Sequence, residues 1–92
     1  GEFPGELVCS RRILALRDFD AQHHTDYFHT LKCYVQNQLN AVQTAKKLFI
    51  HRSTFLYRME KIGEIIDLDL NDYDTLLYVM MTFRIMEQDG EE

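Results

Sequence analysis

The chain has 92 residues, 46% of them hydrophobic and 27% charged, which allows one small domain with a single core. Four glycines and one proline are too few for a turn-rich β fold, and no apolar run is long enough for a membrane span or a signal peptide. The net charge of −5, taken alone, argues against nucleic acid as a partner.

The start of the chain, residues 1–5, is expected to be a tag or a disordered lead, and residues 6–92 are expected to form one helical domain. The chain opens without an initiator methionine, so we expect it to be a fragment of a longer protein. Cys9 and Cys33 lie outside any CxxC spacing. They form one disulfide at most, and two buried thiols in a reducing cytoplasm are the plainer interpretation.

Helical spacing of apolar residues predicts a first helix over about residues 6–18. The polar run that follows, residues 18–24, is interpreted as a connector. Thr25 is predicted to cap a second helix over about residues 26–38, and Asp26 falls in its first turn, where the helix dipole favours an anion.

Asn40 is predicted to cap a short third helix over residues 41–48, and a fourth helix is predicted over residues 52–66. In the fourth helix, apolar residues at spacings of four, three and four share one face: Phe55, Met59, Ile62 and Ile66. Mostly polar residues occupy the opposite face, so this helix is expected to be amphipathic.

Asn71 is predicted to cap a last helix over about residues 72–88. Between residues 76 and 86 the only polar groups are Thr82, Arg84 and the hydroxyl of Tyr78. A helix that is apolar nearly all round needs partners on more than one side. We therefore expect it to form a subunit interface or to dock onto a missing domain. The predicted fold class is all-α, with about five helices.

Positive charge is concentrated in one block of this acidic chain. Residues 41–63 carry five Lys or Arg against one Glu, whereas residues 64–92 carry one Arg against nine acids. Residues 1–40 are nearly balanced, with four basic against five acidic side chains. Since salt screens charges beyond about 8 Å, this local block matters more than the total.

A short helix, a tight turn and a longer amphipathic helix over residues 41–66 predict a helix-turn-helix. Ala45 is small enough to let the two helices cross closely, and four apolar side chains are expected to clamp the turn: Leu48, Ile50, Phe55 and Met59. Phe49 stands where glycine is common in such turns. Because φ > 0 disfavours Phe, the turn here is expected to be of a different type.

The first two turns of a recognition helix meet base edges in this motif, which points to double-stranded DNA as the partner. The candidates for base reading are Arg52, Ser53, Thr54 and Tyr57. The candidates for phosphate contact are Lys46, Lys47, Arg58 and Lys61. His51 either contacts DNA or caps the helix. Alternatives stay open for Arg52 as a salt bridge, Tyr57 as packing and Thr54 as a support for the turn.

Other chemistries find little support. His23, His24, His29 and Cys33 lack the paired spacing of a zinc site, so we predict no metal and no cofactor. The sequence contains no nucleophile–base set, paired carboxylate site or phosphate-binding glycine loop, so an enzyme is not expected. The acidic segment 64–74 is interpreted as a solvated loop and cap, or as a surface that repels DNA. The rival function is a helical protein-interaction module.

The stretch from residue 39 to residue 85 resembles the C-terminal helix-turn-helix domain of PucR/CdaR-type bacterial transcriptional regulators, and more distantly that of the nucleoid protein Fis. The matching positions are Asn40, Ala45, His51-Arg52-Ser53-Thr54, Leu56-Tyr57-Arg58 and Leu68-Asp69-Leu70. Ser53 departs from the pattern, which often has Asn there. The resemblance covers about residues 26–88. It implies a cytoplasmic DNA-binding output domain detached from an upstream sensor region.

A lone motif of this size buries little surface on DNA, so we expect a homodimer. The interface is predicted on the last helix or on the first two helices. A two-fold dimer places its recognition helices about 34 Å apart, one turn of the double helix.

Overall fold

The structure, a computed structural model, describes residues 4–90 and contains only helices and loops in that range. Its elements in chain order are α1 (Pro4–His23), α2 (Tyr27–Gln36), α3 (Ala41–Leu48), α4 (Arg52–Ile66) and α5 (Tyr73–Asp89). The predicted all-α class with about five helices is confirmed. The expectation for residues 1–3 lies outside the described residues.

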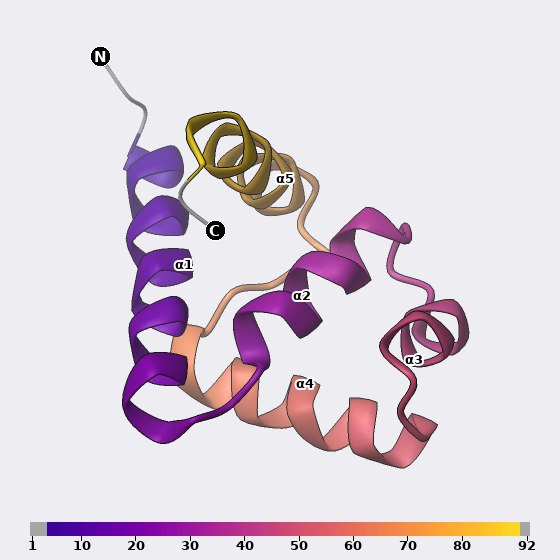
Figure 1. The fold of residues 1–92 in the computed structure, drawn as a ribbon. Coiled ribbons are helices and arrows are strands. Elements are labelled where there is room, and N and C mark those ends of the chain that lie inside the picture. The colour runs from indigo at the N-terminus through magenta and orange to yellow at the C-terminus, as the bar shows by residue number, and fades with distance from the viewer. Residues whose placement is uncertain (1–3, 91–92) are drawn as a thin grey trace.

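The helices are grouped at two ends of the domain, and α2 lies between the two groups (Figure 1). Helices α1 and α5 lie side by side at one end, and α3 lies at the other end, where it packs against α2 and α4. Helix α4 contacts α1, α2 and α3 but not α5. The helix-turn-helix and the last helix therefore occupy different sides of the molecule.

The core is formed where α1, α2, α4 and α5 meet. Its buried side chains are Cys9, Ile13, Leu16, Phe28, Leu31, Val35, Ile62, Ile66, Val79, Phe83 and Met86. The rings of Phe28 and Phe83 meet edge to face with centroids 5.3 Å apart, a preferred aromatic geometry. Both cysteines are free and buried, as predicted, and burial raises the pKa of the Cys9 thiol. Gly5 lies against the ring of Tyr78, where a Cβ would come within 2.7 Å of the ring, so the start of α1 packs closely on α5.

Helix α1 is longer at both ends than the sequence predicted, and the supposed connector 18–24 is wrong. The run contains no glycine or proline to stop the helix, and Phe19 extends the apolar stripe three residues past Leu16. The Phe19 ring also stacks on His23, with centroids 4.0 Å apart. The helix ends at His23, and the next residue, His24, has a left-handed φ of 56°.

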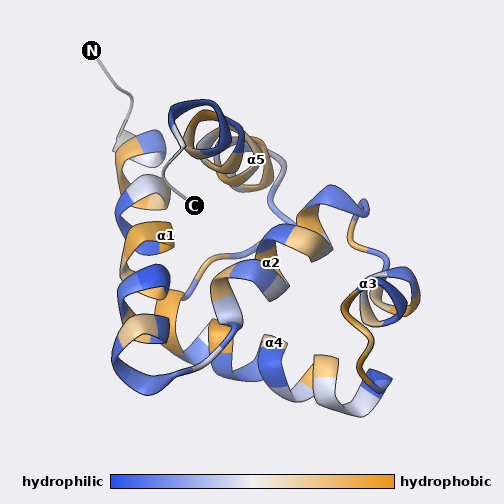
Figure 2. Cartoon of the chain, viewed as in Figure 1, coloured by the Kyte–Doolittle hydropathy of each residue, from blue (hydrophilic) through white to orange (hydrophobic). Residues whose placement is uncertain are grey.

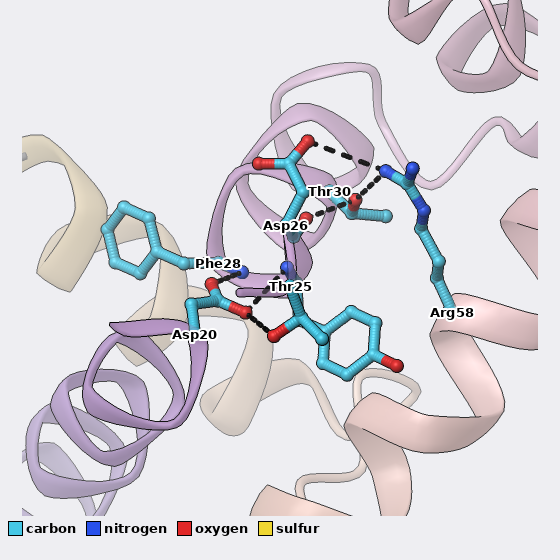
Figure 3. Close-up of polar contacts among 7 residues, drawn as sticks. Asp20, Thr25, Asp26, Phe28, Thr30 and Arg58 are labelled. Carbon is cyan, nitrogen blue, oxygen red and sulfur yellow. Dashed lines mark hydrogen bonds and ion pairs between the residues drawn. The ribbon is translucent and has the colours of Figure 1, made fainter. Parts of the chain in front are cut away.

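The predicted cap of the second helix is also wrong. Asp26, not Thr25, is the N-cap residue, and its side chain makes no capping bond. The acceptor comes instead from α1: the Asp20 carboxylate accepts the backbone N–H groups of Tyr27 and Phe28 at 2.9 and 2.8 Å (Figure 3). The hydroxyl of Thr25 donates to the same carboxylate. Asp20 thus joins α1 to α2 and satisfies donors that a helix start leaves open.

Helices α3 and α4 have the bounds that the sequence predicted. Asn40 caps α3, since its side chain accepts the N–H of Gln43 at 3.0 Å. At the start of α5 the prediction was one residue early. Asp72, not Asn71, is the cap and accepts both the N–H and the hydroxyl of Thr75, which lowers the pKa of its carboxyl group.

Candidate nucleic-acid interface

The turn between α3 and α4 keeps a left-handed residue despite lacking glycine. Phe49 has φ 56° and ψ 42°, so the expected change of turn type is wrong. Its N–H donates to the carbonyl of Lys46, and the N–H of Ile50 donates to that of Ala45, both at 3.1 Å. These two bonds satisfy the end of α3 and hold the turn. The Phe49 side chain is 93% exposed and gains no packing from the fold.

Buried small and aromatic residues set the crossing of α3 and α4. Ala45 is buried, as predicted for the position of close approach. Thr44 is fully buried beside it, and its hydroxyl donates to the carbonyl of Asn40 at 2.7 Å. Phe55 is 1% exposed and its ring lies 5.2 Å from that of Tyr34 in α2. Of the four residues predicted to clamp the turn, only Phe55 is fully buried; the half-buried members are Leu48, Ile50 and Met59. Hydrophobic colour continues through this turn in Figure 2.

The start of α4 presents its side chains to solvent. The exposed residues of its first two turns are Arg52, Ser53, Thr54, Leu56 and Tyr57. His51 is exposed at the N-cap position, but its side chain makes no capping bond, so the capping alternative is not realised. Within the described residues no ion pair ties Arg52 to a neighbouring helix. An amphipathic helix is thus fixed by its buried face and offers a polar one.

Arg58 differs from the other predicted phosphate contacts, because its side chain is only 23% exposed. Its Nη1 donates to the Thr30 hydroxyl at 3.0 Å and lies 3.4 Å from the Asp26 carboxylate (Figure 3). Thr30 is itself fully buried on α2. The guanidinium therefore joins α4 to α2, which sequence spacing alone does not reveal.

The three lysines of the motif are more accessible. Lys46 and Lys47 are exposed in the last turn of α3. Lys61 lies 3.4 Å from the Glu64 carboxylate and 5.5 Å from the centre of the Tyr57 ring. The charge and hydrogen bond of Glu64, together with Tyr57, raise the pKa of Lys61. A surface pair of this kind is weak enough to exchange for a phosphate.

The acidic segment after α4 is engaged in local backbone bonds. Asp67 ends α4 in a left-handed conformation, Asp69 accepts the N–H of Asn71, and Asp72 caps α5. All three are exposed, as expected of a solvated loop and cap. Arg12 of α1 donates to the carbonyl groups of Ile66 and Asp67 and so closes the end of α4. In the described part of the chain, no three His, Cys, Asp or Glu side chains come together as a metal site would need.

A second exposed surface runs along α5 on the side opposite its buried face. We call it the α5 stripe, and it comprises Tyr73, Leu77, Met80, Met81 and Ile85. These positions recur every three or four residues, and the buried ones, such as Val79 and Phe83, lie on the other side. A groove of about 340 Å³ lies between α2 and α5, and three residues of the stripe line it: Leu77, Met80 and Met81. Helix α5 thus carries exposed apolar residues opposite its buried face, and the expectation that another subunit or a missing domain covers them stays a prediction.

The α3–turn–α4 arrangement is a helix-turn-helix, with the longer helix second and its start exposed. A family model agrees: the PucR C-terminal helix-turn-helix domain matches residues 27–85. The chain belongs to this family. The resemblance inferred from the His51–Arg58 run is thereby confirmed, with nearly the same limits.

Several curated relatives are transcriptional regulators by name. The purine catabolism regulatory protein of Bacillus subtilis (strain 168) is 33% identical over 70% of this chain and 12% of that protein. The proline-responsive transcriptional activator PutR of the same organism is 28% identical over 86% of this chain and 19% of its own length. The carbohydrate diacid regulator of Escherichia coli (strain K12) is 34% identical over 64% of this chain and 15% of its own length. The chain thus spans less than a fifth of each of these relatives. No solved structure matches it significantly.

Proposed function

We propose that this chain binds double-stranded DNA in a sequence-specific manner and is the output domain of a transcriptional regulator, not an enzyme. The observation that carries the proposal is the exposed start of α4, which is fixed by the buried Phe55 and lies in the one block of net positive charge. Family membership supports it. The proposal includes a longer parent protein with an upstream sensor region that works in the cytoplasm, where bacterial chromosomal DNA lies. Within residues 4–90 no helix is long and apolar enough to cross a membrane.

In this proposal α4 lies in the major groove with its first two turns toward the bases. Arg52 can fork onto a guanine, and Ser53, Thr54 and Tyr57 flank it for base or phosphate contacts. His51 stands at the same end and is free of a capping role. Lys46, Lys47 and Lys61 suit phosphate contacts, which hold register without reading sequence. Arg58 lies on the same helix, but its guanidinium is hydrogen-bonded to Thr30 of α2 and is therefore less available to a phosphate than the lysines are.

The α5 stripe supports a homodimer as the binding species. Single exposed apolar residues are ordinary, but five on one face of one helix are typical of an interface. Helix α5 does not contact α4, so pairing through the stripe leaves both recognition helices open. Two copies related by a two-fold axis then read two half-sites.

The second candidate, a protein-interaction module without DNA binding, is favoured by the same stripe. The two functions predict different effects of salt concentration and of duplex sequence on DNA binding. A random duplex pool incubated with the chain should yield an enriched motif, and binding should weaken steeply as salt rises. An unenriched pool with no retained duplex at low salt would leave only the interaction module.

A further inference from the structure

Leu56 is an apolar residue in the middle of the polar surface of α4. Its side chain is 49% exposed, and it follows the cationic and hydroxyl side chains of Arg52 and Ser53 by one turn. An exposed leucine is common on protein surfaces and by itself means little. Leu56 is of interest because it lies on the start of α4, which we propose faces DNA.

The core fixes the direction of this side chain. Phe55, the preceding residue, is 1% exposed, and Ile62 and Ile66 continue the same buried face. Successive residues on a helix point about 100° apart, so an anchored Phe55 holds Leu56 at the surface. Residues three and four apart are neighbours on a helix surface, which places Leu56 beside both Ser53 and Arg52.

The major groove offers one apolar group to such a side chain. This is the 5-methyl group of thymine, which projects from the base edge and which apolar side chains contact. Arg52 and Leu56 are four residues, or about 6 Å, apart along the helix axis. Base pairs are spaced by about 3.4 Å, so the two side chains reach bases one or two pairs apart.

We propose that Leu56 contacts the 5-methyl group of a thymine one or two base pairs from the guanine read by Arg52, and so is a specificity-determining residue. This inference rests on the proposed DNA binding. It assigns the chain an apolar contact beside the polar ones, and a half-site that contains a guanine and a nearby thymine.

The test uses uracil, which pairs as thymine does but lacks the methyl group. The enriched duplex is synthesised with each thymine replaced in turn by deoxyuridine, and binding of the 92-residue chain is measured by fluorescence anisotropy. At one or two positions near the guanine, the replacement should weaken binding about fourfold, as expected for losing one buried methyl contact. Leu56→Ala should bind the thymine and uracil duplexes equally.

The readout is the ratio of the two affinities, so a general loss of binding does not imitate the result. Leu7→Ala, the same change at a leucine of α1 that is exposed to a similar degree, is the matched control and should keep the ratio. Equal binding of every uracil duplex by the wild-type chain would overturn the proposal and leave DNA binding intact. So would a retained ratio in Leu56→Ala. If no duplex is bound at all, the proposed function fails and this contact fails with it.

Discussion

The two ends of this small domain present opposite surfaces on one shared core. At the α3–α4 end the exposed side chains include the cations Lys46, Lys47 and Arg52, with the apolar Phe49 and Leu56 between or beside them. At the α5 end the exposed surface is dominated by the five apolar side chains of the α5 stripe, with Arg84 among them, and acids follow at the end of the chain. In Figure 2 hydrophobic colour runs along much of α5. The separation explains how a chain of net charge −5 can carry a surface suited to a polyanion. Charge position within the fold, not the total, indicates the partner.

The largest expected effect comes from breaking the apolar end while leaving the cationic end intact. Met81→Lys places a charge in the middle of the α5 stripe. If the stripe joins two copies, binding to a duplex with two half-sites should weaken on the order of a hundredfold, because the second contact is no longer linked to the first. Analytical ultracentrifugation should show a monomer.

Ala15→Lys is the control for that change. It adds the same charge at an exposed position of α1, so it should remain dimeric and keep its affinity for DNA. A Met81→Lys chain that still sediments as a dimer would contradict the role given to the α5 stripe.

At the cationic end, we expect some residues to contact bases and others to contact phosphates. Arg52→Ala should lose about 1–3 kcal/mol of discrimination between the selected duplex and one with the guanine changed. Lys47→Ala should instead weaken binding to both duplexes alike and make the dependence on salt shallower. The two variants are compared by competition on the same pair of duplexes. Equal behaviour of the two would contradict separate roles.

Arg58 is predicted to contribute to the stability of the fold and not to the binding of phosphate. Its hydrogen bond to Thr30 is largely shielded, so Arg58→Ala should lower the free energy of unfolding by about 1 kcal/mol. The slope of DNA affinity with salt should stay as in the wild type, unlike that of Lys47→Ala. Urea unfolding and a salt series measure the two quantities. A shallower slope would mean that Arg58 leaves Thr30 for a phosphate.

The two asparagines that the sequence presents as caps should differ in stability effect. Asn40→Ala should cost about 1 kcal/mol of unfolding free energy, because Asn40 accepts the N–H of Gln43. Asn71→Ala should be nearly neutral, since Asp72 caps α5 in its place. Urea unfolding of both variants tests this. A similar loss for both variants would indicate that Asn71 also caps α5, as the sequence predicted.

Local signals account for what the sequence predicted well. Asn40 lies next to the helix that it caps, and the spacing of Phe55, Ile62 and Ile66 lies within one helix, so α3 and α4 were located correctly. The missed features depend on contacts between elements. Asp20 caps a helix that starts seven residues later, and Arg58 binds a hydroxyl on another helix.

The remaining differences have other physical causes. Phe49 occupies a left-handed conformation that propensity disfavours, held by the backbone bonds at the end of α3. In the sequence, Leu56 stands out only as part of the matching Leu56-Tyr57-Arg58 run, because a sequence does not show how much of a leucine stays exposed. Its surface position becomes visible only once Phe55 is placed in the core.

The most direct test of the account measures affinity for the selected duplex and a scrambled duplex in parallel, over salt from about 50 to 200 mM. Six lysines in a dimer, Lys46, Lys47 and Lys61 of each copy, predict a slope of about −5 for log affinity against log salt on both duplexes. The selected duplex should bind on the order of a thousandfold more tightly than the scrambled one. Equal affinity for both duplexes would contradict sequence reading by α4, and binding that does not change with salt would contradict the phosphate contacts.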